Sequence, residues 1–366
     1  MKVVFSLKHV SKITDNIGII EHCVFSTADL KEGYCVDDNA RALLACLRVD
    51  GKEKETAQQL IPIYLSFLER ARDKKGFHQD LNQDLTWKDD AGVEEGFGRA
   101  MVALAETTLL AEKDNQKFTA AFIFDQQAFL IPTIKSLRAM AQTIIAISKR
   151  IKFSEKQPLD TFDGRSVSTL SIPQALASGV ERVDLKRELI VLSDKLIKNY
   201  QKHSSKEWKW YEDIITYDNG RLPLSLFCAF QVTKDRKYLE VAKESLDFLI
   251  EQIYDHSKDC FSFVGNKGWY PRDKKPAIFD QQPIEAGSTV EVCVKAYEII
   301  KDPQYLYFTK QAFLWYSGKN IKKISLIDKS TGGIYDGLES QKVNQNEGAE
   351  SVLSYILACL VLKKLN

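Results

Sequence analysis

Residues 33–42 have the sequence Gly33-Tyr34-Cys35-Val36-Asp37-Asp38-Asn39-Ala40-Arg41-Ala42. After the glycine, apolar residues recur at the spacing of a helix face, at Ala40, Leu43, Leu44 and Leu47. Two carboxylates, an amide and a guanidinium therefore gather at the N-terminal end of a predicted helix. Such a concentration of polar groups favours a pocket for a neutral, hydroxyl-rich ligand over a purely structural role.

Four further predicted helix starts share this chemical character. They are Glu94-Glu95-Gly96-Phe97-Gly98-Arg99, Thr216-Tyr217-Asp218-Asn219-Gly220-Arg221-Leu222-Pro223, Phe279-Asp280-Gln281-Gln282-Pro283-Ile284-Glu285-Ala286, and Gly332 to Leu338 continuing to Asn344 to Glu350. Helix capping accounts well for a single Asp or Asn, and acids in a first turn favour the helix dipole. Surface ion pairs are an alternative for Asp38 with Arg41 and for Glu95 with Arg99. Neither alternative explains why carboxylates, amides and arginines occur together beside aromatic residues.

The rest of the chain is predicted to be a series of helical pairs. Apolar periodicity indicates twelve helices, near residues 39–50, 54–73, 94–109, 115–129, 132–150, 165–179, 182–201, 221–232, 235–253, 284–300, 303–318 and 347–363. Short loops alternate with long polar, aromatic ones. We therefore predict an all-α fold, an (α/α)6 toroid of six helical hairpins, as one domain over residues 1–366 with an irregular N-terminal segment at 1–32. An open solenoid is the alternative, but no fixed repeat period is visible.

Composition excludes several other classes of protein. Lys+Arg 51 against Asp+Glu 50 gives a net charge of +1, without the basic face that a nucleic-acid or membrane-surface binder needs. No stretch approaches the roughly 20 apolar residues of a membrane span. The seven cysteines lack zinc spacing, and most lie in apolar helical patterns, which predicts reduced thiols in a reducing compartment. We therefore expect a cytoplasmic protein with no metal and no cofactor, and without nucleic-acid or membrane partners.

Sugars fit the polar helix starts because they offer hydroxyl groups and apolar ring faces. Acceptors and donors for the hydroxyls would stand beside aromatic stacking surfaces. The loop aromatics predicted to be such surfaces are Trp87, Trp208, Trp210, Trp269 and Tyr270. The residues predicted to hold hydroxyls are His22, Asp37, Asn39, Arg41, Arg99, Asp218, Asn219, Arg221, Gln281, Gln282 and Asn346.

Cleavage of a glycosidic bond needs two carboxyl groups, one as acid and one as base or nucleophile. The candidates are Asp38, Glu95, Asp280, Glu285 and Glu350, with Asp38 and Glu285 as the first pair to test. The adjacent Asp37 and Asp38 could also form a coupled pair, because neighbouring like charges raise one pKa. Motifs for nucleotide binding, serine hydrolysis or zinc proteolysis do not occur in the sequence.

Seven ordered motifs between Ile13 and Leu362 resemble the six-hairpin glycosidase-like domain of bacteria. They are GI-x-EH, GYCVDDNARAL, EEGFGRAMVALAE, TYDNGRLPLSL, GWYPRD, FDQQPIEA and TGGIYDGL…NQNEGAES. That domain occurs alone or behind GT4-type glycosyltransferase modules, and the resemblance implies an (α/α)6 toroid. Asp37-Asp38-Asn39-Ala40 is also similar to the paired-aspartate helix start of α-mannanases on that toroid. At Glu94–Arg99 the chain departs from the family pattern, where Glu-Asp precedes a small residue and His-Gly-Arg.

These observations predict a glycoside hydrolase that acts on an oligosaccharide, with mannose-containing glycans among the candidates. The expected ligand is a glycan, and a glycosyltransferase is a candidate partner. One alternative is a non-catalytic glycan-binding or glycosyltransferase-partner module. Another is a sugar epimerase or isomerase on the same toroid, similar to the N-acylglucosamine 2-epimerases, which use histidines as acid and base. The few loop histidines in this sequence argue against the second alternative.

Overall fold

The computed structural model describes residues 3–156, 161–162, 165–166 and 183–365. This part of the chain is predominantly helical, as predicted. Its α-helices are α1 (Lys8–Lys12), α2 (Val36–Arg48), α3 (Lys54–Ala71), α4 (Glu95–Leu110), α5 (Asp114–Ala128), α6 (Leu137–Lys156), α7 (Leu185–His203), α8 (Arg221–Thr233), α9 (Arg236–Ile253), α10 (Pro283–Ile300), α11 (Pro303–Trp315) and α12 (Ala349–Lys363). The helix expected at 165–179 lies outside the described residues, except for residues 165–166, which form a strand.

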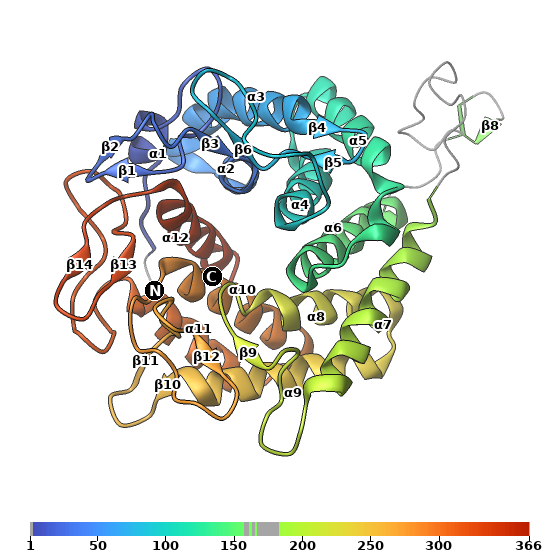
Figure 1. Cartoon of the computed structure of the whole chain (residues 1–366). Helices are drawn as coiled ribbons and strands as arrows, with labels where there is room; N and C mark the ends of the chain where they lie inside the picture. Colours follow the sequence, from blue (N-terminus) through green and yellow to red (C-terminus); the bar gives the residue numbers. More distant parts are fainter. Residues whose placement is uncertain (1–2, 157–160, 163–164, 167–182, 366) are drawn as a thin grey trace.

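Six helices form an inner ring. Each of α2, α4, α6, α8, α10 and α12 packs against the next in this order, and α12 packs against α2, so that the ring closes (Figure 1). The outer helices α3, α5, α7, α9 and α11 each pack against the inner helix that precedes them in the chain. The chain thus alternates between an inner and an outer helix, which is the hairpin arrangement that the loop lengths predict.

The sixth inner helix, α12, packs against the N-terminal helix α1 in place of a following outer helix. Helix α1 contacts α12, and the two regions are joined by hydrogen bonds. The His9 Nε2 atom lies 2.8 Å from the carbonyl oxygen of Glu347, and the Tyr355 hydroxyl donates to the carbonyl of Val4. The segment 1–32, expected to be irregular, therefore contains a short helix that contributes to ring closure.

The inner and outer helices differ in how their sequences are buried. In α4 every residue from Gly96 to Thr108 is buried, and α10 and α12 are similarly enclosed. A helix that is covered on all sides needs small and apolar residues all round. The outer helix α3 instead buries one face, at Ala57, Leu60, Ile61, Tyr64, Leu65, Phe67, Leu68 and Ala71. Its charged residues lie on the opposite face.

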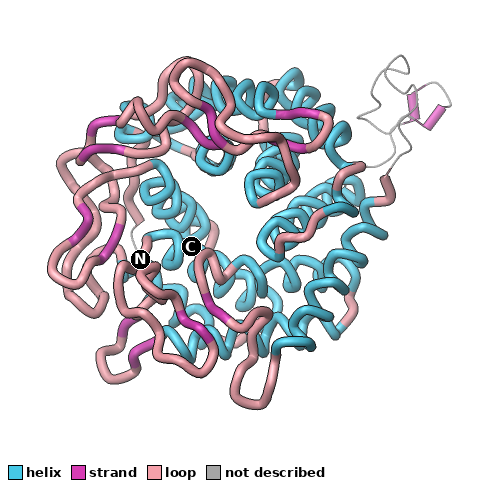
Figure 2. The backbone as a smooth tube through the Cα atoms, viewed as in Figure 1, coloured by secondary structure: helices cyan, strands magenta, loops and turns pink. Residues whose placement is uncertain are grey.

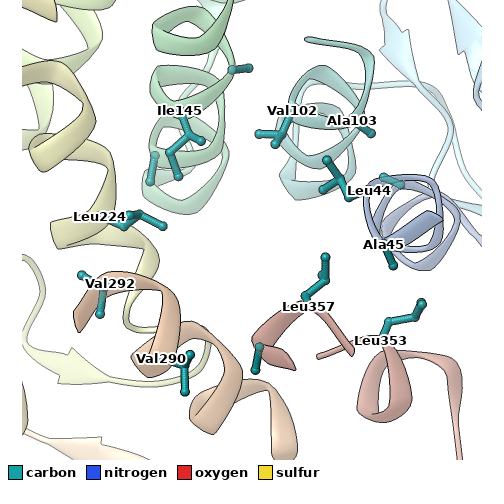
Figure 3. Packing of buried hydrophobic residues seen from close by; sticks show 14 of the residues in the cluster. Leu44, Ala45, Val102, Ala103, Ile145, Leu224, Val290, Val292, Leu353 and Leu357 are labelled. Atoms are coloured by element: carbon teal, nitrogen blue, oxygen red, sulfur yellow. The ribbon is translucent and has the colours of Figure 1, made fainter. Parts of the chain in front are cut away.

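All six inner helices contribute buried apolar side chains to one hydrophobic cluster. Figure 3 shows Leu44 of α2, Val102 of α4, Ile145 of α6, Leu224 of α8, Val290 of α10 and Leu357 of α12 within one buried cluster. At roughly 25 cal/mol per Å² of apolar surface removed from water, these contacts are the main force that holds the ring together. The seven cysteines are all buried, and none forms a disulfide.

The loops between helical pairs contain short antiparallel ladders of two residues per strand (Figure 2). The paired strands are β1 (Cys23–Val24) with β2 (Thr27–Ala28), β3 (Tyr34–Cys35) with β6 (Asp80–Leu81), β4 (Arg72–Asp73) with β5 (Gly76–Phe77), β7 (Thr161–Phe162) with β8 (Arg165–Ser166), β9 (Ile214–Ile215) with β12 (Tyr270–Pro271), β10 (Tyr254–Asp255) with β11 (Cys260–Phe261), and β13 (Gly337–Leu338) with β14 (Val343–Asn344). Two of these ladders, β3 with β6 and β9 with β12, join loops that are far apart in sequence. They fix the loops over one end of the ring. No helix within the described ranges is long and apolar enough to span a bilayer.

We expect Gly33→Ala to lower the free energy of unfolding by about 2–4 kcal/mol, because it combines an unfavourable φ with a backbone clash. Gly33 has a φ of +78°, and a Cβ built there would lie 2.2 Å from the carbonyl oxygen of Leu81. Gly51 is a matched control, with a φ of +67° and no atom within 4 Å of an added Cβ. Denaturant unfolding of both variants would check this. Equal losses would show that φ alone matters.

Candidate functional site

The five polar stretches lie at the starts of inner helices α2, α4, α8, α10 and α12, as predicted. Contacts between these starts bring them to the same end of the ring. Strand β3 before α2 pairs with β6 in the loop before α4. Gln281 before α10 bridges Leu338 before α12. The ring therefore presents several polar helix starts on one face, which we call the mouth.

Capping does not explain the acids at the mouth. The helix starts of α4, α8, α10 and α12 have no side-chain cap hydrogen bond, and the cap of α2 is the sulfur of Cys35. The outer helices α7, α9 and α11 are capped by Asp184, Asp235 and Asp302. Ordinary Asp caps thus occur at the far end of the ring. The mouth carboxylates are available for other interactions.

A cavity of about 340 Å³ opens at the mouth between α2, α10 and α12, and we call it the mouth cavity. Its volume falls in the usual range for small-molecule sites. The lining residues are almost all polar. They are Glu21, His22, Cys35, Asp37, Asp38, Arg41, Gln79, Asn266, Asp280, Gln282, Asp336, Gly337, Asn344, Asn346, Gly348, Glu350 and Ser351.

Arg41 forms the floor of the mouth cavity. Its Nη1 donates to Asp38 Oδ1 at 2.7 Å, and its Nη2 donates to Glu350 Oε2 at 2.8 Å. The guanidinium therefore joins the start of α2 to the start of α12. Burial raises the pKa of Glu350, although the charge of Arg41 opposes that shift. The other oxygen of Asp38 accepts a hydrogen bond from the Cys35 thiol at 3.3 Å.

Glu21 lies against Asp38 in the same cavity. Its backbone N–H donates to Gly33, and its carbonyl accepts from Ala349, so it bridges the starts of α2 and α12. One oxygen of Glu21, the Cys35 sulfur and one oxygen of Asp38 all lie within 4.8 Å of one another. Burial, followed by the charge of Asp38, raises the pKa of Glu21 to about 7. Glu21 is thus a carboxyl group that can carry a proton near neutral pH.

Glu21, Cys35 and Asp38 are the one group of three among the described residues with the spacing of metal ligands. Cysteine binds metals as the thiolate. Burial and the charge of Asp38 raise the pKa of Cys35 well above its usual value, which keeps the thiol protonated. The chemistry of this group therefore suits a pair of carboxyl groups better than a metal site.

Below the mouth cavity, ion pairs continue along the ring axis. Arg99 contacts Asp37 at 3.3 Å through Nε and Asp218 at 2.8 Å through Nη2. Asp218 also pairs with Arg221, and Arg221 pairs with Glu291.

Arg48 then pairs with Glu291 through Nη1 and with Glu106 through Nη2, and the series of ion pairs ends there. We call this series the axial network. Although burial raises the pKa of Asp218, the charges of Arg221 and Arg99 lower it to about 2. A second cavity of about 320 Å³ lies along this part of the axis. Arg41 lines both cavities.

The structure brings eight of the predicted site residues to the mouth cavity. They are His22, Asp37, Asp38, Arg41, Asp280, Gln282, Asn346 and Glu350. Three others, Arg99, Asp218 and Arg221, lie beneath it in the axial network. One oxygen of Asp37 is buried without a hydrogen-bond partner among the described residues.

Four predicted residues are buried side chains whose polar atoms mainly serve internal contacts. Asn39 accepts from Ile19 N and donates to Cys35 O. Gln281 accepts from Phe263 N and Trp315 Nε1. Each of these two side chains is fully buried and hydrogen-bonded on both of its polar atoms, and neither lines the mouth cavity.

Glu285 and Asn219 form the other internal pair. Glu285 accepts from the backbone N–H groups of Asp218 and Asn219 and from Asn219 Nδ2. Glu285 is 3 % exposed and does not line the mouth cavity. Burial and the charge of Asp218 raise its pKa to about 8. The structure thus gives Glu285 the geometry of a group that anchors the loop before α8.

The loop aromatics divide into buried and partly exposed groups. Trp208 and Trp210 are buried at 4 % and 0 % exposure, so the prediction that they are stacking surfaces is wrong. Trp87 is stacked on His78, outside the mouth cavity. Tyr270 donates to Gln252.

Trp269 is partly exposed and packs near Tyr217 at a ring separation of 5.9 Å. The Arg138 guanidinium lies over the ring of Tyr217, with its Cζ atom 4.8 Å from the ring centroid. Glu95 lies 4.0 Å from Arg138, and burial raises the pKa of this carboxyl. Trp269, Tyr217, Arg138 and Glu95 thus form a separate polar and aromatic wall at the starts of α4, α6 and α8.

Two acidic residues of the mouth cavity were absent from the candidates drawn from sequence. Glu21 precedes His22 in the GI-x-EH motif, and Asp336 lies within the TGGIYDGL motif. Both belong to loops before an inner helix and so lack helical periodicity. Their positions within the quoted motifs are the signal that could have identified them.

No family model matches the chain, and no curated protein matches it in sequence. Solved structures do share its fold. A cellobiose 2-epimerase from Bacillus thermoamylovorans matches with a TM-score of 0.68 and 14 % identity, over 98 % of this chain and 96 % of that one. A family 76 α-mannanase from Bacteroides thetaiotaomicron matches with a TM-score of 0.61 and 13 % identity, over 98 % and 94 %.

A third structure carries a bound glycan. It is an inactive variant of an α-1,6-mannanase from Salegentibacter, with two adjacent aspartates replaced by alanine, in complex with α-1,6-mannotetrose. It matches with a TM-score of 0.60 and 10 % identity, over 98 % of this chain and 96 % of that one. At such identities the likeness establishes the fold alone. These neighbours are sugar-processing enzymes of two reaction types, hydrolysis and epimerisation.

Proposed function

We propose that this protein is a glycoside hydrolase that cleaves an oligosaccharide in the mouth cavity, with Glu21 and Asp38 as its catalytic carboxyl groups. The single observation that carries the proposal is this pair. One oxygen of Glu21 lies within 4.8 Å of one oxygen of Asp38, and both residues line one cavity. Two carboxyl groups with environments that separate their protonation states are typical of acid and base roles.

Glu21 would be the general acid. Its raised pKa keeps a proton available near pH 7, and it would donate that proton to the glycosidic oxygen as the bond breaks. Asp38 would be the nucleophile, held in place by Arg41, whose Nη1 donates to Asp38 Oδ1 at 2.7 Å. Its attack on the anomeric carbon would form a glycosyl ester. Glu21, now ionised, would then take a proton from the water that hydrolyses this ester.

The short separation supports a retaining reaction. Retaining glycosidases hold their two carboxyl groups about 5–5.5 Å apart, whereas inverting enzymes need about 6.5–9.5 Å to accommodate a water. Glu350 and Asp37 would position Arg41 and Arg99 beneath the reacting sugar. The glycan would also contact Asp280, Gln282 and Asn346. The neighbour that binds α-1,6-mannotetrose supports a glycan ligand, and mannose-containing oligosaccharides are the first to test.

The test is cleavage of a panel of linear oligosaccharides of differing sugar and linkage. New reducing ends would be measured for the protein and for Glu21→Gln. We expect at least one glycan to be cleaved, and the Glu21→Gln variant to lose most of that activity. NMR of the first-formed anomer should show retention. Inversion, or full activity in Glu21→Gln, would contradict the proposed roles.

The rate should depend on pH through Glu21. The acid must be protonated, and its pKa is about 7, so activity should be maintained below that pH. Above it, the protonated fraction falls about tenfold per pH unit, and kcat/KM should fall with it. A profile of kcat/KM between pH 5 and 9 would check this. A rate that rises through pH 8 would exclude Glu21 as the acid.

A sugar epimerase or isomerase is the second candidate, and the match to a cellobiose 2-epimerase favours it. His22 lines the mouth cavity, and its Nε2 lies 3.5 Å from Glu21. It is the one histidine that lines that cavity among the described residues, whereas a two-histidine mechanism needs a partner. Exchange of the sugar C2 proton with solvent deuterium would identify this reaction. Stabilisation by glycans without any turnover would instead favour a glycan-binding module.

The domain organisation, the partner and the cellular location of the protein are also proposed. The helix ring supports one (α/α)6 domain over residues 1–366, with α1 and α12 as the sixth, unequal hairpin. A glycosyltransferase of the GT4 type stays a candidate partner on the sequence resemblance alone. A cytoplasmic location likewise rests on the sequence.

A further inference from the structure

More carboxyl groups line the mouth cavity than its ion pairs engage. Six carboxyl groups line it, those of Glu21, Asp37, Asp38, Asp280, Asp336 and Glu350. Arg41 is shared by Asp38 and Glu350. Arg99 pairs with Asp37. The exposed Lys267 pairs with Asp280 at an Nζ–Oδ2 distance of 3.0 Å.

Two of the six groups have no lysine or arginine partner among the described residues. They are Glu21, whose one ionic contact is to His22, and Asp336. Asp336 Oδ1 accepts hydrogen bonds from Gly348 N at 2.8 Å and from the Ser351 hydroxyl at 2.7 Å. These neutral donors hold the side chain in place at the start of α12. They do not neutralise it.

The acids also affect one another. Burial raises the pKa of Asp336, the hydrogen bonds from Ser351 and Gly348 oppose that shift, and the charge of Asp38 adds to it. The same charge raises the pKa of Glu21 and, against Arg41, that of Glu350. Neutral hydroxyl groups would leave this repulsion as it is. A positively charged group in the cavity would relieve it, because opposite charges a few Å apart in a partly buried site attract strongly.

We propose that the substrate of the mouth cavity is a glycan that carries a free, protonated amino group, and that Asp336 receives this ammonium. The proposal rests on the assignment of the mouth cavity as a sugar-processing site, and it specifies the substrate class. It also excludes substrates with carboxylate or phosphate groups at this position, since such groups would add to the repulsion. An acetylated amine would lose the attraction together with its charge.

The test compares sugars that differ at one substituent. Glucosamine, mannosamine and galactosamine are each titrated into the protein beside the N-acetylated and the hydroxyl counterpart, with calorimetry as the readout. The titrations are made at pH 6.5 with a chelator present. We expect each amino sugar that binds to bind at least tenfold more tightly than its two counterparts. Raising the salt concentration should weaken the binding of the amino sugars and leave the binding of the neutral sugars unchanged, because only the amine is held by charge.

Asp336→Asn and Asp280→Asn form a matched pair of variants. Both remove one carboxylate from the same cavity, but Asp280 is already paired with Lys267. Asparagine at 336 can still accept from Gly348 and Ser351, so the loop should keep its position. We expect Asp336→Asn to reduce the preference for the amine by about tenfold or more, and Asp280→Asn to reduce it less. Thermal unfolding would verify that both variants are folded.

Two results would overturn the proposal. One is equal or tighter binding of the hydroxyl or N-acetyl sugars, and the other is no binding by any amino sugar. Tight binding or cleavage of neutral glycans alone would reject the amino group while the proposed hydrolase stands. A clear preference for amines in a protein that cleaves none of the glycans would reject the proposed hydrolase and keep the proposed amine site. The salt dependence gives an answer on the unaltered protein even if a variant fails to fold.

Discussion

Asp38→Asn should reduce kcat on a responsive glycan by a factor of about 10⁴ or more, the scale seen when a covalent nucleophile is removed. Asparagine keeps the size of the side chain but cannot attack the anomeric carbon. Asp38 is 2 % exposed and contacts Arg41, so part of any loss could come from a displaced guanidinium. A second variant separates the two causes. In Asp38→Gly, added azide can occupy the emptied space and attack in place of the carboxylate.

We expect azide to restore part of the activity of Asp38→Gly and to yield a glycosyl azide of inverted configuration. Mass spectrometry and NMR would identify that product. Asp114→Asn is the control, because Asp114 lies on outer helix α5 with its side chain 98 % exposed and should tolerate the change. If Asp38→Asn keeps more than about a tenth of the activity, Asp38 is not the nucleophile.

The second large effect should be on stability. Arg99→Met should lower the free energy of unfolding by about 3–5 kcal/mol, since removal of one partner leaves a buried charge without compensation. Arg99 is 4 % exposed and lies between Asp37 and Asp218, and Asp218 is 1 % exposed. Methionine preserves much of the apolar stem, so the loss measures the charge more than the packing.

Denaturant unfolding with Arg236→Met as control would measure this loss. Arg236 is exposed at the start of α9 and should change stability by less than about 0.5 kcal/mol. Combining Arg99→Met with Asp218→Asn should recover part of the loss, because the unpaired carboxylate is then gone. A loss below about 1 kcal/mol in the single variant would mean that water replaces the guanidinium and that the axial network contributes little.

The sequence predicts the architecture well because its signals are local. Glycine turns, polar first residues and apolar periodicity locate the starts of α2, α4, α8, α10 and α12 without knowledge of the tertiary structure. Helix α1 was missed because five residues are too few for a periodic pattern. The outer helix of the sixth hairpin therefore could not be recognised as the N-terminal segment.

The site is predicted less completely, because spacing shows where a polar side chain occurs but not which way it points. Asp38 and Asn39 are adjacent, yet Asp38 lines the cavity and Asn39 holds Ile19 and Cys35. Loop tryptophans look available for a ligand, but Trp208 and Trp210 fold back into the core. Glu21 becomes part of the site only through backbone bonds to Gly33 and Ala349, which lie more than 300 residues apart.

The contact of α12 with α2 completes the mouth cavity late in synthesis. Glu21, Asp38 and Asp336 reach one cavity only when the last inner helix joins the first. At about 5–20 residues per second, the ribosome needs roughly 15 to 65 s to proceed from Glu21 to Glu347. Throughout that interval the early helices can pack, while Asp336 and Glu350 have not yet joined Glu21 and Asp38. The mouth cavity is thus complete only after the last inner helix has been made.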